Sequence, residues 1–207
     1  RAIQYLCESR GLNKTLVETF LLSGDIYEDS KRHNVVFVGR DRSGTPRYAH
    51  VRGTQESFRQ DIAGSDKSYP FRYEGNGSQL FVFEAPIDLL SHGALMQLSM
   101  KKQCTAVGMS EMYRSDCWLG INRVSLSGCS DIALKQRLSD DPRIKQIVFC
   151  LDNDERGRQA TEKLMSDYSA NYTVKVSIPP YGKDWNDTLK AVVSAHSKQT
   201  DKTKTEE

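Results

Sequence analysis

The second half of the chain alternates short apolar runs with longer amphipathic segments. Strands of about six residues between helices of ten or more are typical of βαβ units, which build a mainly parallel sheet with helices on both faces. The predicted strands are residues 79–83, 123–127, 145–151 and 172–178. The predicted helices are residues 87–100, 131–138, 156–169 and 184 to about 195. Residues 103–121 fit this alternation poorly, and we expect a short strand at 104–107 within otherwise irregular sequence.

The first part of the chain has a different pattern. Apolar positions at helical spacing predict two short helices within residues 2–22, interrupted at Arg10 and Gly11. Residues 34–38 and 47–51 flank turn-forming residues and predict a hairpin, with further strands in residues 58–73. The turn formers at 75–78 mark a boundary. The sequence therefore predicts an α+β subdomain at 1–78, an α/β domain at 79–195 and a polar tail at 196–207.

Composition places the chain among globular proteins. Of its 207 residues, 38% are hydrophobic and 27% are charged, and no apolar run approaches the roughly 20 residues that span a bilayer. We therefore expect no membrane segment. The first residue is Arg1 rather than an initiator methionine, so we expect a piece of a longer protein. The five cysteines lack zinc-ligand spacing and are odd in number, which favours buried free thiols in a reducing, cytoplasmic compartment.

Positive charge is concentrated in the first part of the chain. Residues 31–72 contain nine Lys or Arg and four Asp or Glu, whereas the whole chain has a net charge of only +2. A basic segment joined to an acidic one suits a protein that holds a polyanion with one part and gathers cations with the other. Alternatively, the basic side chains only solvate one face of a sheet.

Acidic residues follow three of the predicted strands. Glu84 comes directly after residues 79–83, Asp152 and Asp154 end the strand at 145–151, and residues 183–187 hold a third acidic cluster. Ligands of open α/β sheets bind at this carboxyl edge, and positions i and i+2 of an extended segment face the same side. Two carboxylates ~4 Å apart repel by about 4 kcal/mol at an effective dielectric constant of 20, which Mg²⁺ relieves. Alternatively, both aspartates cap the next helix.

These motifs resemble a known domain. A strand ending at Glu84, a second unit at residues 125–128, and Phe-Cys-Leu-Asp-Asn-Asp-Glu-Arg-Gly at 149–157 resemble the Toprim domain. That domain is shared by bacterial-type primases, type IA and type II topoisomerases and some nucleases. The resemblance covers about residues 79–190. It implies a Toprim-like α/β fold, a mainly parallel sheet flanked by helices, preceded by a smaller basic α+β subdomain.

Two further segments are similar to primase sequences. Lys-Asp-Trp-Asn-Asp at 183–187 looks like the third acidic motif of bacterial primases, which usually reads Lys-Asp-Pro-Asp. Here Trp185 replaces the proline and Asn186 the second aspartate, and Asp187 could substitute for it. Residues 34–53 and 64–67 are similar to the module that precedes Toprim in primase-like proteins of plasmids and conjugative elements.

The resemblance implies roles for particular residues. Glu84 would be the general acid or base of phosphoryl transfer. Asp152 and Asp154, with Asp184 and Asp88, would hold one or two Mg²⁺ ions, with Mn²⁺ as a substitute. The residues expected to bind template or nucleotide are Arg40, Arg47, Arg52, Lys67 and Lys183. The implied activity is template-directed primer synthesis by a metal-dependent nucleotidyltransferase, with single-stranded DNA and nucleoside triphosphates as ligands.

Two other functions stay open at this point. One is DNA cleavage by a Toprim nuclease or topoisomerase, although none of the nine tyrosines stands out as a nucleophile. The other is a non-catalytic nucleic-acid-binding module of a mobile element. Phosphate-binding loops, serine-hydrolase elbows and HExxH zinc motifs are absent from the sequence. Complete bacterial primases also carry zinc-binding and helicase-binding domains, so a helicase or relaxase partner would bind through flanking regions.

Overall fold

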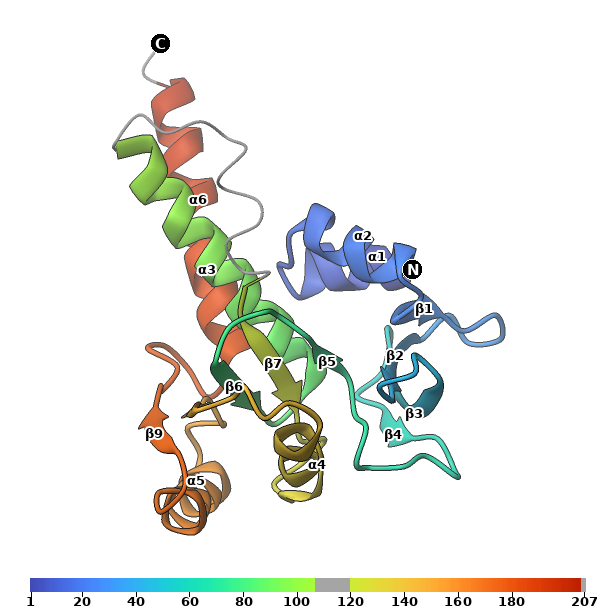
Figure 1. Cartoon of the computed structure of the whole chain (residues 1–207). Helices are drawn as coiled ribbons and strands as arrows, with labels where there is room; N and C mark the ends of the chain where they lie inside the picture. The colour runs from blue at the N-terminus through green and yellow to red at the C-terminus, as the bar shows by residue number, and fades with distance from the viewer. Residues whose placement is uncertain (107–119, 206–207) are drawn as a thin grey trace.

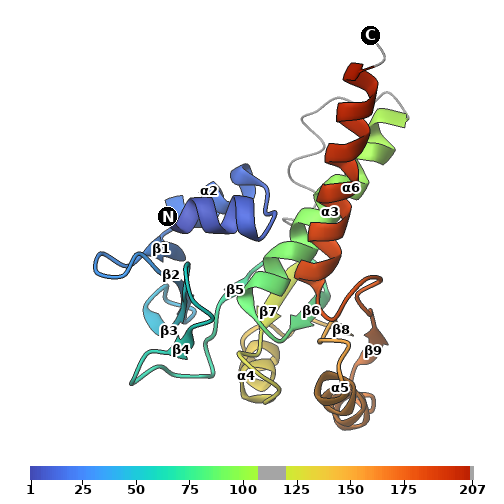
Figure 2. The same ribbon diagram turned by 180° about the vertical axis from the view of Figure 1, so that it is seen from behind.

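The chain folds around two sheets, labelled in Figures 1 and 2. The computed structural model describes residues 1–106 and 120–205, with side chains for 1–100 and 120–196. The first sheet is antiparallel with strand order β1-β2-β3-β4. Its strands are β1 (Ile26–Glu28), β2 (Val35–Arg40), β3 (Pro46–Arg52) and β4 (Arg59–Asp61). Before them come α1 (Ala2–Gln4), the π-helix η1 (Tyr5–Ser9) and α2 (Lys14–Leu22).

The second sheet is mostly parallel, with strand order β5-β7-β6-β8-β9. Only β5 runs antiparallel to its neighbour β7. The strands are β5 (Arg72–Tyr73), β6 (Gln79–Phe83), β7 (Asn122–Ser125), β8 (Gln146–Phe149) and β9 (Thr173–Val176). The helices are α3 (Pro86–Ala106), α4 (Ile132–Asp140), α5 (Glu155–Tyr168) and α6 (Trp185–Thr205).

Helices cover both faces of the parallel sheet. In Figures 1 and 2, α3 and α6 lie side by side on one face and project together beyond it, while α4 and α5 lie on the other. Alternate residues of each strand face opposite layers. Leu80 and Val82 pack in the core with α4 and α5, whereas Phe83 and Val148 pack in the core with α3 and α6. Burial on both faces explains why these strands are apolar throughout.

The two sheets share one hydrophobic core. The core cluster beneath α3 and α6 also contains Leu16 and Phe20 of α2 and Phe37 of β2. Phe71, just before β5, lies 5.2 Å from Phe20 and 5.3 Å from Phe37, measured between ring centroids. These contacts fix the antiparallel sheet against the parallel one. The boundary between residues 78 and 79 stays a prediction, and β5, which precedes it, pairs with β7.

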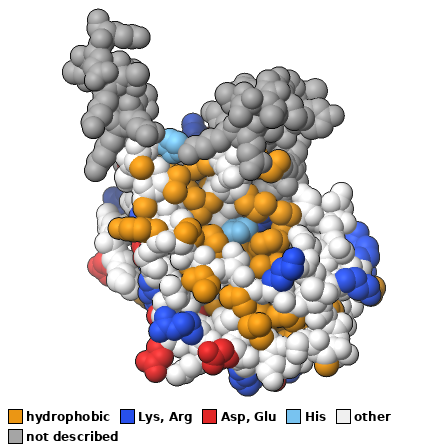
Figure 3. Space-filling model, turned by 90° about the vertical axis from the view of Figure 1, so that its left-hand side faces the viewer, with side chains coloured by type: hydrophobic (Ala, Val, Ile, Leu, Met, Phe, Trp, Pro, Cys, Tyr) orange, Lys and Arg blue, Asp and Glu red, His pale blue; other side chains and the backbone are white. Residues whose placement is uncertain are grey.

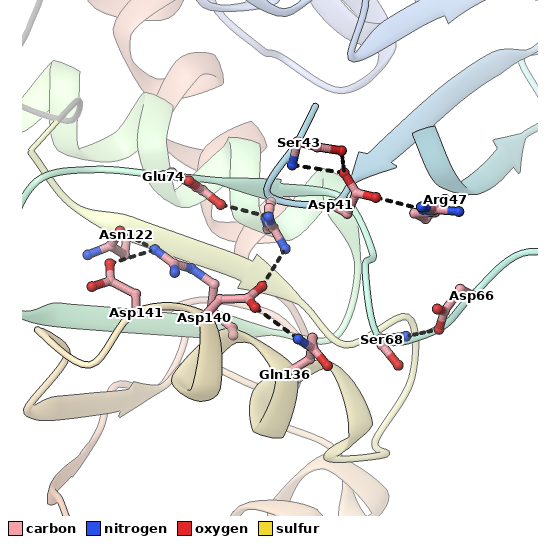
Figure 4. Close-up of polar contacts among 12 residues, drawn as sticks. Asp41, Ser43, Arg47, Asp66, Ser68, Glu74, Asn122, Gln136, Asp140 and Asp141 are labelled. Carbon is pink, nitrogen blue, oxygen red and sulfur yellow. Dashed lines mark hydrogen bonds and ion pairs between the residues drawn. The ribbon is translucent and has the colours of Figure 1, made fainter. Parts of the chain in front are cut away.

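Two arginines with little-exposed side chains, Arg72 and Arg137, join α4 to β5 and β7, and Figure 4 labels their partners Glu74, Asn122, Asp140 and Asp141. Arg72 of β5 forms an ion pair with Glu74 at 2.7 Å and lies 3.7 Å from Asp140 of α4. Arg137 donates to Asn122 Oδ1 at 2.8 Å and to Asp141 Oδ2 at 3.1 Å. The side chains of Asp140 and Asp141 are also little exposed, so removing one partner of these pairs would leave an uncompensated charge.

Most of the predicted elements are confirmed, and their differences from the structure have simple causes. The predicted strand at 104–107 is wrong for residues 104–106, which continue α3, and residue 107 lies outside the described residues. The last helix does not end near residue 195 but continues to Thr205, since no glycine or proline interrupts it. The strand β1 was not expected, because three residues are too short for a periodic pattern.

The cysteines agree only in part with the expectation of buried free thiols. Of the cysteines whose side chains the structure describes, Cys7, Cys129 and Cys150 are free, but only Cys150 is buried.

Within the described ranges, no helix combines the length and apolar character needed to cross a membrane. The edge strand β9 and the segment after it expose Val176 and Ile178. Figure 3 views this side of the molecule and shows apolar side chains spread over it.

Candidate active site between the two sheets

A cleft of about 420 Å³ lies between the carboxyl edge of the parallel sheet and the antiparallel sheet. The ends of β6 and β8 contribute Glu84 and Asp152, and the segment before α6 contributes Lys183 and Asp184. Strands β3 and β4 line the opposite side with His50, Arg52, Arg59 and Asp61. Carboxylates therefore face a basic wall across one cavity of the size that holds small ligands.

Glu84 lies directly against the end of β8. Its Oε1 accepts a hydrogen bond from the Asp152 backbone N–H at 3.3 Å. Burial raises the pKa of Glu84, and the negative charge of Asp154 adds to this effect, while hydrogen bonds from Asp152 N–H and the Cys129 thiol oppose it. Burial raises the pKa of Asp152 to about 6, with the Glu84 charge as the second cause and Lys183 opposing. Two carboxyl groups distant in sequence are thus electrostatically coupled.

The turn after β7 positions Glu84 from the other side. Ser127 has φ +52° and Gly128 has φ +128°, so the chain bends sharply at the end of the strand. The Gly128 N–H donates to the Glu84 carbonyl oxygen at 3.1 Å. Glycine suits this position because a side chain is strained at such a φ angle. The unit at residues 125–128 therefore fixes the backbone that carries Glu84.

A glycine lets α5 approach the two carboxylates. A Cβ atom at Gly157 would lie 2.1 Å from the Asp152 carbonyl oxygen and 2.8 Å from Glu84 Oε1. The carbonyl belongs to the backbone and cannot rotate away. The absence of a side chain at this position therefore sets how closely the first turn of α5 packs against Asp152 and Glu84.

Asp154 makes two contacts, of which the first is the helix cap that the sequence offered as one alternative. Its Oδ1 caps α5 by accepting a hydrogen bond from the Gly157 N–H at 2.8 Å. Its Oδ2 lies 2.9 Å from Lys183 Nζ, and the same ammonium group lies 3.4 Å from Asp152 Oδ2. The two carboxylates thus face one point, as their spacing predicts, and a lysine cation occupies it. The hydrogen bond from Gly157, followed by that from Lys183, lowers the pKa of Asp154.

The remaining candidate metal ligands, Asp184 and Asp88, accept hydrogen bonds from backbone N–H groups at the start of α6. Asp184 accepts a hydrogen bond from the Asp187 N–H at 2.7 Å, and Asp88 accepts one from the Asn186 N–H at 3.2 Å. Asp88 is buried, and burial followed by the Asp184 charge raises its pKa well above the ordinary value. Asp187 bonds to the Lys183 N–H and to Lys190 and does not line the cleft. Both Asp88 and Asp184 line it.

No preformed metal centre of three or more protein ligands is present among the described residues. Asp152 and Asp154 nevertheless present oxygen atoms to one cation, the Lys183 ammonium. Magnesium typically uses one or two protein carboxylates and keeps several waters, so this pair fits its donor preference. The expected metal ligands stay a prediction.

The predicted basic residues divide between the cleft and other surfaces. Arg52 and Lys183 line the cleft, and Lys67 lines a neighbouring hollow and pairs with Asp61 at 3.1 Å. Arg40 and Arg47 lie outside the cleft. Arg40 forms an ion pair with Asp25 at 2.7 Å, and Arg47 forms one with Asp41 at the same distance, the latter shown in Figure 4. The structure therefore brings together two of the five at the candidate site.

The structure adds cleft residues that were not singled out from the sequence. They are Arg10, His50, Arg59, Asp61 and Arg156. Arg59 belongs to the basic run at 31–72, and Arg156 belongs to the motif at 149–157, so weak signals existed for both. Nothing in the sequence indicates a binding role for Arg10, which the sequence pattern places only at the interruption between two helices. It reaches the cleft through contacts with Asn186, 176 positions away.

The site thus combines carboxylates at one edge of a parallel α/β sheet with a basic antiparallel sheet beside it. This is the arrangement expected of a Toprim domain and the subdomain that precedes it. Comparison with protein families agrees with this class. Residues 81–189 match the family described as Toprim-like, which covers more than half of the chain, and the chain belongs to this family. Residues 4–77 match a family described as a protein of unknown function, DUF3991. A comparison with curated proteins found no match.

Solved structures of primases share the fold. The primase fragment of the bacteriophage T7 primase-helicase is 18% identical with a TM-score of 0.59, over 94% of this chain and 71% of that one. The DnaG primase catalytic domain bound to single-stranded DNA is 14% identical with a TM-score of 0.57, over 96% and 70%. The Escherichia coli primase catalytic core is 14% identical with a TM-score of 0.54, over 91% and 68%. At these identities the similarity establishes the fold alone.

Replacing Gly157 by alanine tests the close packing at the site. We expect Gly157→Ala to lower the free energy of unfolding by about 2 kcal/mol, because the new Cβ overpacks against the Asp152 carbonyl. An alanine in a helix otherwise stabilises it by up to about 1 kcal/mol relative to glycine. Urea unfolding measures the difference. The control Glu162→Ala, on the exposed face of α5, should stay within about 0.5 kcal/mol of the wild type. A Gly157→Ala protein as stable as the wild type would contradict the packing described here.

Proposed function

We propose that the chain is the catalytic core of a primase-type nucleotidyltransferase, which joins nucleotides on a single-stranded DNA template. The observation that carries this proposal is the cleft itself, in which Glu84 and Asp152 face Arg52 and Arg59. Phosphate groups carry negative charge, so a basic wall can hold them while the acidic edge binds the cations that neutralise them.

The solved relatives support the ligand class. One of the structures similar to this chain is a primase domain bound to single-stranded DNA, and another contains primase domains bound to an RNA/DNA hybrid and dTTP. By analogy, single-stranded DNA and nucleoside triphosphates are the ligands proposed for this chain. The helicase or relaxase partner, the mobile-element context and the cytoplasmic location stay predictions from the sequence.

Magnesium, or manganese in its place, is the cofactor that the cleft would hold. Asp152 and Asp154 would bind it, with Asp184 and Asp88 along the same edge. When bound, the ion would neutralise the charge that develops on the transferred phosphoryl group. Lys183, displaced from the aspartate pair, would then face the phosphates of the nucleotide.

Glu84 would act as the general base. The 3′-hydroxyl oxygen of the primer forms a bond to the α-phosphorus of the nucleotide, and the bond from that phosphorus to the bridging oxygen of pyrophosphate breaks. Glu84 takes the hydroxyl proton, and pyrophosphate leaves. Burial raises the pKa of Glu84, which makes its carboxylate a stronger base than an exposed glutamate. Hydrogen bonds from the Asp152 N–H and the Cys129 thiol, and to a smaller extent the Arg156 charge, oppose this rise in pKa.

A primer-synthesis assay tests the proposed activity. With single-stranded template, nucleoside triphosphates and Mg²⁺ or Mn²⁺, we expect labelled oligonucleotides from the wild type. Glu84→Gln should reduce the rate at least about 100-fold, because it removes the base without changing the shape. The control Glu162→Gln carries the same change on the exposed face of α5 and should keep the wild-type rate.

The same assay separates the alternative functions. Plasmid nicking that needs no nucleoside triphosphates would assign the chain to the Toprim nucleases or topoisomerases instead. A folded protein that binds single-stranded DNA but makes no product with either metal would assign it to the non-catalytic modules. Either result contradicts the proposal.

The lysine at the aspartate pair gives a separate prediction on metal binding. Because the Lys183 ammonium lies 2.9 Å from Asp154 and 3.4 Å from Asp152, a divalent ion must displace it. We expect Lys183→Met to bind Mn²⁺ several-fold more tightly than the wild type, measured from the signal of free Mn²⁺ in electron paramagnetic resonance. Lys190→Met removes a lysine that pairs with Asp187 outside the cleft and should not change the affinity. Equal or weaker Mn²⁺ binding by Lys183→Met would contradict this site.

A further inference from the structure

The hydroxyl group of Tyr5 forms hydrogen bonds with two arginines that line the cleft. Its hydroxyl oxygen accepts a hydrogen bond from Arg10 Nε at 2.8 Å and another from Arg52 Nε at 3.1 Å. Tyr5 is buried in the core shared by the two sheets, so its hydroxyl is held in place. Both guanidinium groups line the cleft that contains Glu84 and Asp152. One fixed oxygen atom therefore holds two cations side by side.

Arg10 has further contacts that fix its direction. Its guanidinium carbon lies 5.0 Å from the centroid of the Tyr5 ring, and its Nη1 donates to Asn186 Oδ1 at 3.3 Å. Asn186 in turn donates to the Arg10 carbonyl oxygen at 2.8 Å and to Ser91 Oγ at 3.0 Å. The beginning of α6 thus holds the segment after η1 against the cleft. Arg10 is therefore positioned both by Tyr5 of the preceding helix η1 and by the tertiary contact with Asn186.

The bonding of these two arginines differs from that of Arg40 and Arg47, two arginines elsewhere in the antiparallel sheet. Arg40 and Arg47 each form an ion pair with a neighbouring aspartate at 2.7 Å. Within the described part of the chain, neither Arg10 nor Arg52 has a carboxylate within 4.0 Å of its guanidinium nitrogens. Two like charges held close together repel each other, and an anion between them removes that repulsion. Guanidinium groups match phosphate oxygens in geometry and charge.

We propose that Arg10 and Arg52, held together by Tyr5, form a clamp for the polyphosphate group of a nucleoside triphosphate. This assignment rests on the proposed function, because it places the nucleotide in the same cleft as Glu84. Tyr5 and Asn186 are positioning residues, since they act through the arginines.

The position of the pair favours a nucleotide over a template strand. The pair lies in the same cavity of about 420 Å³ as the carboxylate edge, which is the size of a small-ligand site. With the α-phosphate at the carboxylate edge, the β- and γ-phosphates extend across the cleft to its basic wall. Arg59 is exposed and is better placed for a long strand that passes the mouth of the cleft.

Equilibrium binding of two labelled ligands to the intact chain tests the clamp. The first is a non-hydrolysable nucleoside triphosphate with a fluorophore, and the second is a fluorescein-labelled single-stranded oligonucleotide, both with Mg²⁺ and followed by anisotropy. We expect Arg10→Gln and Arg52→Gln each to raise the Kd for the triphosphate about tenfold, with Kd for the oligonucleotide changed less than about twofold. Inorganic tripolyphosphate should displace the triphosphate from the wild type, and less effectively from both variants.

Two further variants keep the result interpretable. Tyr5→Phe retains the ring and its packing but removes the oxygen that holds both Nε atoms, so it should weaken triphosphate binding several-fold. Arg42→Gln removes an exposed arginine outside the cleft and should bind the triphosphate as the wild type does. Thermal unfolding confirms that each variant is folded.

Two outcomes would overturn the clamp. One is unchanged triphosphate binding in folded Arg10→Gln and Arg52→Gln proteins. The other is loss of oligonucleotide binding in place of triphosphate binding, which would assign the pair to strand phosphates. Because these measurements need no turnover, they are independent of primer synthesis. An intact clamp in a chain that makes no primer would leave this inference standing and contradict only the proposed activity.

Discussion

The parallel pairing of β6 with β8 is the constraint on which the candidate site depends. Val82 lies opposite Phe149 in this register, so the residues that follow the two strands leave the sheet at the same edge. Glu84 therefore meets the backbone of Asp152, although 68 positions separate them. A shift of one residue in this pairing would reverse which side chains face each layer and would separate the two carboxyl groups.

The antiparallel sheet completes the site by supplying charge of the opposite sign. Apolar contacts such as those of Phe71 fix it against the parallel sheet. Arg52 lines the same cleft as Asp152, and among the described residues no carboxylate lies within ion-pair distance of its guanidinium group. A basic wall opposite an acidic edge favours a ligand that carries phosphates and divalent cations together.

The sequence predicts the parallel sheet well because its strands are buried on both faces. The predicted strand at 79–83 is confirmed with the same bounds, and the acidic residues at strand ends follow from general rules for α/β sheets. Contacts between distant segments could not be predicted in this way. Arg10 depends on Asn186, and the charge run at 31–72 does not reveal that Arg40 is engaged by Asp25. The packing role of Gly157 depends on a backbone approach that has no sequence pattern.

The pKa of Asp152 tests the coupling at the sheet edge most directly. A carbon-13 NMR titration of its carboxyl group in the metal-free protein should give a pKa of about 6 in the wild type. In Glu84→Gln the same group should titrate at clearly lower pH, because a negative charge beside it has been removed while burial remains. A pKa that is near 3.8 in the wild type, or that is unchanged by Glu84→Gln, would contradict the arrangement of the two carboxyl groups.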